Sequence, residues 1–205
     1  RDRQISVLVT TLLESQHLSK QPLDEKIAKR TLDQFLKRLD PRKLYFNQSD
    51  MDQFLKLASQ LEDRLSNHDL TIAYTIFHRF RARVGERSKT IDRLLSGKFD
   101  FNLKETINQD SNLNQFAKNP EEAEDRWRRQ IKYDLLTLNS ADPQATATRE
   151  QVAKRYRQFT QQIGDTTADD LLEMFLSSLA SSFDPHTSYL SPPSYESFQI
   201  RMRLN

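Results

Sequence analysis

The sequence predicts an all-α fold, and three observations lead to that prediction. The chain of 205 residues contains only 3 Gly and 7 Pro, whereas a β-rich chain needs more glycines in its turns. Apolar residues recur at helical spacing along most of the chain. Charged residues make up 29% and hydrophobic residues 36% of the total, which suits helices that bury one face and expose a wide polar face. We expect about seven amphipathic helices in an irregular bundle, with a C-terminal helical arm.

Two helices are predicted before the first Asp-Pro dipeptide. In the first, residues 4–19, the apolar side chains fall on one side of the helix. They are Ile5, Leu8, Val9, Leu12 and Leu13. Pro22 suits the first turn of the second helix, where no N–H partner is needed, and this helix runs to Leu39. The apolar residues 44–46 that follow are expected to enter the core.

Two more helices are predicted in the middle of the chain. Ser49 with Asp52 resembles a capping box, and the helix that it starts carries an apolar stripe to Leu65. After a break at 67–69, a long helix runs from about Leu70 to Ser96. Residues 102–119 are polar with scattered apolar side chains, and we interpret them as a surface loop.

Three helices complete the predicted domain. Asn119-Pro120-Glu121-Glu122 combines a cap, a proline at the first helical position and acids at the positive end of the helix dipole. A second helix follows Asp142-Pro143 and extends to about Gly164. The last full helix begins at Thr167 with Asp170 and ends at Phe183.

An Asp-Pro corner follows this last helix at residues 184–192. Pro185 disfavours the helical conformation at Asp184, so the helix should end there. The Asp184 side chain can bond to nearby backbone N–H groups and hold a turn. Pro192 suits the first turn of a new helix. We predict a rigid hinge whose principal residues are Asp184, Pro185, Tyr189 and Pro192, with Leu190 as a second anchor beside Tyr189.

The same pattern occurs earlier in the chain. Residues 39–46 (LDPRKLYF) and 183–190 (FDPHTSYL) both read apolar-Asp-Pro-x-x-x-Tyr-apolar. The two copies reflect either an old duplication or one local solution reached twice, and we favour the second interpretation. A repeat architecture is not predicted, because periodic arrays need several copies.

Composition excludes several classes of site. The chain contains no Cys, which rules out disulfides, thiolate metal sites and cysteine nucleophiles. The net charge of +2 is small and does not by itself indicate nucleic acid or an anionic membrane as a partner. No apolar run approaches the length of a membrane span. Because the chain starts at Arg1 with no signal peptide, we expect a processed or trimmed piece.

The candidate catalytic and metal-binding residues have simpler explanations. Asp184, His186 and Ser191 suggest a catalytic triad, but three residues within one short turn rarely reach triad geometry. We therefore expect no catalytic residue in this chain. None of the four His residues is four positions from another or in an H-E-x-x-H frame, and the sequence has no Gly-rich phosphate loop. We expect no metal and no cofactor.

Two basic clusters are candidates for binding a partner. The first lies on the long central helix and includes Arg79, Arg83 and Arg87, and the second comprises residues 126–132. One interpretation is an anionic partner; the other is a solvated face neutralised by neighbouring Asp and Glu. The near-neutral net charge argues against nucleic acid, which we do not expect as a partner.

The segment DPHTSYLSP at 184–192 resembles the tail-specific, or C-terminal processing, proteases. In that family such a segment leads from an N-terminal helical domain into a PDZ domain. Other matching motifs follow in the family's order across nearly the whole chain. They are LDPRKLYFNQSD at 39–50, FDF at 99–101, WRRQIKYDLL at 127–136 and KRY at 154–156. One departure is FAKNP at 116–120, where the family often has Ala-x-Trp-Pro.

The resemblance implies a full-length serine endopeptidase with a Ser-Lys dyad. Both the dyad and the PDZ domain would lie beyond Asn205, so no catalytic residue is carried over to this sequence. The implied partners are protein substrates with apolar C-terminal tails, bound by the PDZ domain, and a helical-repeat lipoprotein adaptor, bound by the helical regions. The implied location is the periplasm, with association with the inner membrane or cell envelope left open.

Two functional hypotheses result. In the first, residues 1–183 are the non-catalytic helical domain of such a protease, 184–192 form the corner, and 193–205 begin a linker arm toward the PDZ domain. The domain would shape substrate entry, dock an adaptor and couple to the PDZ domain. In the second, the chain is a stand-alone helical interaction module without enzymatic activity.

Overall fold

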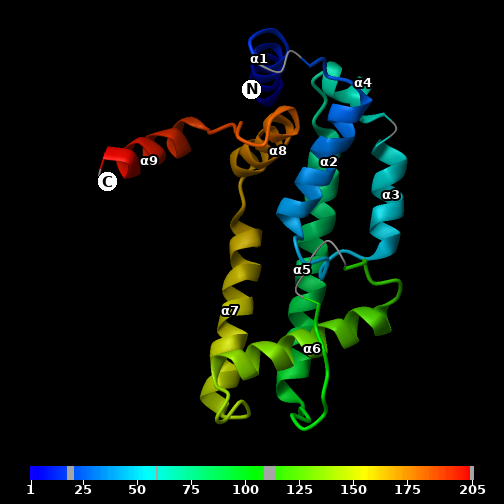
Figure 1. Ribbon diagram of the computed structural model, residues 1–205, viewed down its shortest axis with the longest axis vertical. Coiled ribbons are helices and arrows are strands. Elements are labelled where there is room, and N and C mark those ends of the chain that lie inside the picture. The colour runs from blue at the N-terminus through cyan, green and yellow to red at the C-terminus, as the bar shows by residue number, and fades with distance from the viewer. Residues whose placement is uncertain (18–20, 59, 109–113, 204–205) are drawn as a thin grey trace. The chain divides into compact units, whose positions relative to one another are not determined.

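The computed structural model describes residues 1–17, 21–58, 60–108 and 114–203, and the regular elements of these ranges are all helices (Figure 1). The all-α prediction is confirmed. The nine helices of the described ranges are α1 (Asp2–Ser15), α2 (Glu25–Leu39), α3 (Gln48–Ala58), α4 (Leu61–Ser66), α5 (Thr71–Ser96), α6 (Pro120–Leu138), α7 (Thr146–Asp165), α8 (Ala168–Phe183) and α9 (Pro192–Arg203).

The chain forms two compact units. Unit 1 contains Arg1–Leu39, Phe54–Phe77 and Thr167–Asn205, and unit 2 contains Asp40–Gln53 and His78–Thr166. The chain therefore passes from one unit to the other within α3 and again within α5. Each unit has its own buried side chains, and each is described separately below.

The helix count exceeds the expected seven for two reasons. The helix predicted from Ser49 to Leu65 is divided, because the Gln60 N–H bonds to the Leu57 carbonyl at 3.2 Å in a tight turn and a new helix starts at Leu61. The arm itself is the ninth helix. The predicted Ser49 cap was also wrong: α3 starts at Gln48, and the Asp50 carboxylate accepts the Asn47 N–H at 2.9 Å.

The core of unit 1 is built on the pairing of α2 with α8. Phe35 and Phe175 are almost fully buried and meet edge to face, with ring centroids 5.2 Å apart. Beside them the Thr31 hydroxyl donates to Ser182 Oγ at 3.0 Å. α8 begins with the predicted capping box of Thr167 and Asp170 and ends at Phe183 as expected. Two apolar stripes and a buried hydroxyl pair thus fix how α2 lies on α8.

The buried face of α1 differs from the prediction. Ser6, Thr10 and Leu13 are buried, whereas Leu8 is 61% and Leu12 43% exposed. α1 packs on α8. The Thr10 hydroxyl donates to the Ser6 carbonyl at 2.6 Å and also lies 3.3 Å from His68 Nδ1. Of the five apolar residues expected on one side of this helix, Leu13 is buried, Ile5 and Val9 are half-buried, and Leu8 and Leu12 are exposed.

The core of unit 2 is formed by α5, α6, α7 and residues near Phe99. Its centre is Trp127 on α6, which is 1% exposed. The remaining buried members of this cluster are Ile91, Leu95, Phe99, Ile131, Leu135, Val152 and Ala153. α6 begins as predicted, with the Asn119 side chain accepting the Glu122 N–H at 2.8 Å and proline at the first position.

Within the described part of the chain, no helix combines the length and apolar character that crossing a membrane requires. α9 extends away from the other helices of unit 1 (Figure 1) and has no buried residue. Its exposed apolar side chains are Tyr195, Phe198, Ile200 and Met202.

Candidate functional site

The first Asp-Pro corner, in unit 2, is organised by a buried carboxylate. Asp40 is 3% exposed. Its Oδ1 accepts the Leu44 N–H, and its Oδ2 accepts the Tyr45 and Phe46 N–H groups, all at 2.9 Å. Burial raises the pKa of this carboxyl, although the three N–H groups and Arg87 act in the opposite direction. One side chain therefore satisfies three consecutive backbone donors that would otherwise lack partners in the interior.

The backbone at Lys43 makes this arrangement possible. Its N–H bonds to the Asp40 carbonyl at 3.1 Å, which closes a turn, and its φ of 54° lies in the left-handed region. This conformation costs energy for a residue with a Cβ. It reverses the chain so that the following three N–H groups point back at the carboxylate.

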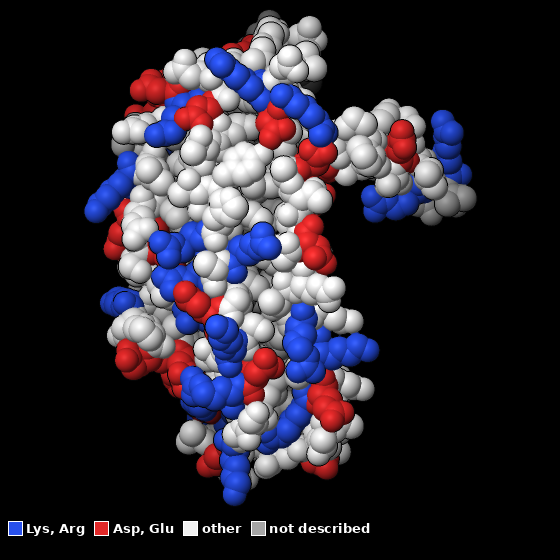
Figure 2. Space-filling view, turned by 180° about the vertical axis from the view of Figure 1, so that it is seen from behind, with Lys and Arg blue, Asp and Glu red and all other residues white. Residues whose placement is uncertain are grey.

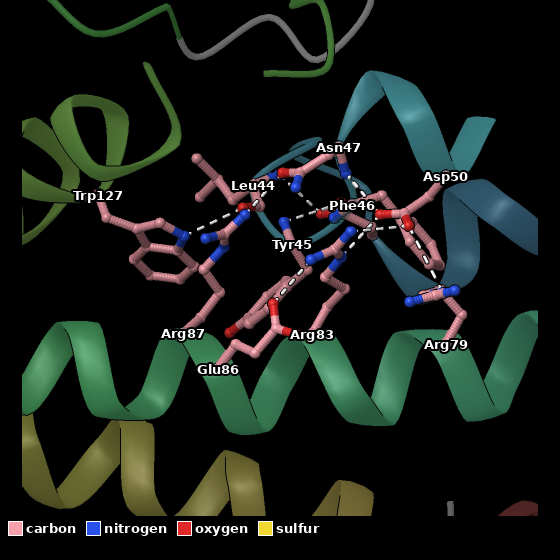
Figure 3. A network of polar contacts seen from close by, with 11 residues as sticks. Leu44, Tyr45, Phe46, Asn47, Asp50, Arg79, Arg83, Glu86, Arg87 and Trp127 are labelled. Carbon is pink, nitrogen blue, oxygen red and sulfur yellow. Dashed lines mark hydrogen bonds and ion pairs between the residues drawn. The ribbon is translucent and has the colours of Figure 1, made fainter. Parts of the chain in front are cut away.

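The three residues after Lys43 are held by aromatic contacts and one indole hydrogen bond. Phe46 is fully buried, and the Tyr45 ring packs against Phe80 and Trp127 with centroids 5.5 and 5.1 Å away. The Trp127 indole N–H donates to the Leu44 carbonyl at 3.0 Å (Figure 3). The expectation that residues 44–46 enter the core is confirmed for Phe46, whereas Leu44 and Tyr45 are half-buried.

A second buried carboxylate, Asp50, lies at the start of α3 and faces the arginines of α5 (Figure 3). Asp50 is 1% exposed. Its two oxygens accept the Arg83 Nη2–H and Nε–H at 2.9 and 2.8 Å, a bidentate pair, and Arg79 Nε lies 3.6 Å away. Such a fork fixes both the distance and the orientation of the two elements. Asp50 thus joins the N-terminus of α3 to α5.

The three arginines proposed to bind a partner, Arg79, Arg83 and Arg87, fall on one side of α5 because they are spaced by four. Arg87 is 7% exposed, and its Nη2–H donates to Asn47 Oδ1 at 2.6 Å. Burial and the neighbouring Arg83 lower the pKa of Arg87. Arg83 is engaged with Asp50, and Arg79 is the most exposed of the three. Their binding of a partner stays a prediction, while the structure shows their internal contacts.

Sequence reasoning missed Asp50 and Asn47, the residues that these arginines contact. Three arginines at a spacing of four indicate an anion-binding face on a helix. No pattern in the sequence indicates that the anion is Asp50, which lies 33 positions before Arg83.

The second Asp-Pro corner, in unit 1, follows the predicted path but is held more loosely. Asp184 is half-buried, and its Oδ1 accepts the His186 N–H at 2.8 Å. The Thr187 N–H bonds to the Asp184 carbonyl at 3.0 Å. Among the described residues the positive φ values outside glycine are at 43 and 68, so this corner does not reverse as the first does. Its chain continues in an extended form.

The extended chain after Asp184 runs back along α8. The Ser177 hydroxyl donates to the Tyr189 carbonyl at 2.6 Å, and the Ser194 hydroxyl donates to Glu173 at 2.8 Å. Tyr189 is half-buried, but Leu190 is 37% exposed, so its role as an anchor was wrong. Pro192 is the first residue of α9, as predicted. The role of the four hinge residues in motion stays a prediction.

The residues considered for a catalytic triad have separate partners. The Asp184 carboxylate bonds to the backbone of His186, and the Ser191 hydroxyl donates to Ser194 Oγ at 3.2 Å. In the described ranges, no three His, Asp or Glu side chains are placed to hold a metal ion.

The second basic cluster is largely neutralised. Arg128 pairs with Glu105 and with Asp125, and Lys132 Nζ lies 2.7 Å from Glu105. These contacts lower the pKa of Glu105 to about 2. On the face shown in Figure 2, basic and acidic side chains are intermingled. The charges of this cluster are compensated as in the second interpretation, but the cluster is not solvated throughout, because Lys132 is only 5% exposed.

Comparison with known proteins places this all-α chain in a class, the N-terminal domains of proteases. The chain belongs to the tail-specific protease N-terminal domain family, whose model matches residues 9–193. It is 30% identical over 197 residues to the tail-specific protease of Haemophilus influenzae. The match covers 96% of this chain and 28% of that protein.

Proposed function

We propose that this chain acts as the non-catalytic helical domain of a PDZ-containing Ser-Lys tail-specific endopeptidase. The observation that carries the proposal is the family match over residues 9–193, which spans both Asp-Pro corners. The chain spans 28% of the length of the curated relative, so peptidase activity is proposed for a longer protein and not for this segment.

Three roles are proposed for the domain: shaping substrate entry, docking an adaptor and coupling to the PDZ domain through the second corner. The proposed partners are substrates with apolar C-terminal tails and a helical-repeat lipoprotein adaptor, in the periplasm or at the cell envelope. The exposed apolar side chains of α9 support coupling, because a helix with no buried residue gains stability when another surface covers it.

Replacing Pro185 by Ala in the full-length protein tests the coupling role. Alanine removes the restriction on Asp184, so α8 should fray onward and loosen the start of α9. We expect the rate of tail-dependent cleavage to change while the circular dichroism of the helical domain stays the same. Pro143→Ala, in the loop between α6 and α7, is the matched control and should leave the rate unaltered.

An unchanged cleavage rate in the Pro185→Ala protein would show that the corner is only a connector. Reading the coding sequence past Asn205 tests the wider proposal independently. If no PDZ-like segment and no Ser-Lys pair follow, the chain is a stand-alone interaction module and the protease assignment fails.

A further inference from the structure

A polar hollow of about 330 Å³ lies in unit 2 beside the first corner. Three arginines line it, Arg42 from the corner and Arg126 and Arg129 from α6, together with the buried amide of Gln130. Leu44 and Ile107 add an apolar wall. The hollow thus offers several N–H donors next to a surface on which carbon atoms can pack.

The charges around the hollow are incompletely balanced. Glu122 also lines it, but its Oε1 accepts from Arg126 at 2.5 Å and its Oε2 accepts the Lys118 N–H at 2.9 Å. Arg129 Nη2–H donates to Asp125 Oδ2 at 2.6 Å, and Asp125 is shared with Arg128. In the described part of the chain, the Arg42 guanidinium has no hydrogen bond and no ion pair, and the Arg42 carbonyl accepts from Asn114 Nδ2 at 3.5 Å. About one positive charge at the hollow therefore lacks a counterpart.

One buried donor at the hollow is also unused. Arg129 Nε is excluded from solvent and has no hydrogen-bond partner within the described ranges. An unmade hydrogen bond of this kind is costly, and a buried polar atom without a partner needs an explanation. Because Nε is closed to solvent, the Arg129 side chain would have to turn toward the hollow before a ligand oxygen could accept from it.

We propose that this hollow binds a carboxylate carried by a peptide, with Arg42 and Arg129 as the charged contacts. A carboxylate is planar, carries a single negative charge and matches the guanidinium fork. A single unbalanced positive charge at the hollow matches the single negative charge of a carboxylate better than the two charges of a phosphate dianion. The apolar wall of Leu44 and Ile107 accommodates the carbon atoms next to the carboxylate. The proposal is independent of any peptidase activity.

The chain carries its own reporter for this site. Trp127 is the single Trp of the sequence, and its indole N–H bonds to the carbonyl of Leu44, which lines the hollow. A ligand that contacts Leu44 should therefore change the emission of Trp127.

Titration of the 205-residue chain with three probes tests the proposal. The probes are a neutral peptide with a free C-terminal carboxylate, a capped tetraglutamate amide and inorganic phosphate. We expect a saturable change in Trp127 emission and a matching heat of binding with at least one of the two peptides. The two peptides distinguish binding of a carboxylate at the end of a peptide chain from binding of side-chain carboxylates.

Arg42→Gln should weaken this binding by about tenfold or more, since it removes a charge-assisted contact with the ligand. Among the described residues the Arg42 guanidinium has no hydrogen bond or ion pair that the substitution would break. Arg129→Gln should act in the same direction. Arg157→Gln is the control, because it removes an exposed Arg of the same unit that pairs with Asp92 at 3.6 Å outside the hollow. The proposal is wrong if neither peptide gives a saturable response, if phosphate binds more tightly than both, or if Arg42→Gln binds as the unaltered chain does.

Discussion

At the scale of single residues, the two aspartates of the Asp-Pro corners have different roles in the same sequence pattern. Asp40 accepts three N–H groups inside unit 2, whereas the side chain of Asp184 accepts one at the surface of unit 1. The difference arises at the third residue after each Asp. Lys43 takes a positive φ and reverses the chain, and Thr187 does not.

Replacing these two aspartates by alanine should therefore lower the unfolding free energy by different amounts. Asp40→Ala leaves one buried and two half-buried N–H groups without a partner, and we expect a loss of about 3–5 kcal/mol of unfolding free energy. Asp184→Ala should cost under about 1 kcal/mol, because its single N–H partner is exposed to water. Urea unfolding measures both, with Trp127 fluorescence for the first and circular dichroism for the second. Equal losses of unfolding free energy would show that the Asp40 contacts stabilise the fold no more than those of a surface turn.

Arg83 and Arg79 provide a second pair for comparison. Arg83→Met leaves the buried Asp50 without its bidentate partner, and we expect a loss of about 3–5 kcal/mol. Arg79→Met removes a longer contact from a side chain that is 41% exposed, and it should cost less than about 1 kcal/mol. A double-mutant cycle with Asp50→Asn isolates the coupling. A coupling energy near zero for Arg83 would contradict the role of Asp50 as the joint between α3 and α5.

At the scale of elements, Glu105 ties the segment after Phe99 to α6. Hydrogen bonds from Arg128 and Lys132 hold its pKa at about 2, below the ordinary value of 4.5. A depressed pKa means that the contribution to stability is present above the ordinary value and is lost as the pH falls toward the folded-state value. We therefore expect unit 2 to lose stability between about pH 4.5 and 2.

Glu105→Gln should flatten that part of the stability profile, as measured by urea unfolding at successive pH values. Glu121→Gln is the control and should leave the profile unchanged, because Glu121 is an exposed acid in the first turn of α6 and has no ion pair with a described residue. If the unfolding free energy changes equally with pH in the unaltered chain and in Glu105→Gln, the ion pairs of Glu105 do not link this segment to α6.

Elements with strong local signals could be predicted from the sequence. α6 and α8 begin where their caps predicted, because N-cap bonds form within a few residues and need no distant partner. α1 could not be predicted in the same way. Which of its faces is buried depends on contacts with distant residues, such as that of Thr10 with His68, 58 positions away, and these contacts bury Ser6 and Thr10 and leave Leu8 and Leu12 exposed.

At the candidate site, too, contacts between residues distant in the sequence could not be predicted. Arg79, Arg83 and Arg87 could be predicted to share one helix face from their spacing alone. Their partner Asp50 could not, because the pairing joins residues 33 positions apart. The shared Asp-Pro pattern predicted two equal corners, yet the backbone conformation of Lys43, which the pattern does not encode, makes them different.

At the scale of the whole molecule, the chain is an all-α member of the tail-specific protease N-terminal domain family, with two compact units. Its buried carboxylates are used for structure: Asp40 holds a turn and Asp50 joins two helices. We propose that such a domain positions other parts of a longer protein and breaks no bond itself.

The most direct measurement of this central claim is a cleavage assay on the purified 205-residue chain. The substrate is an unstructured peptide with an apolar C-terminal tail, and the full-length protein is assayed in parallel under the same conditions. We expect cleavage by the full-length protein and none by the chain alone. Reproducible cleavage by the pure chain, at a rate that follows its concentration, would contradict it.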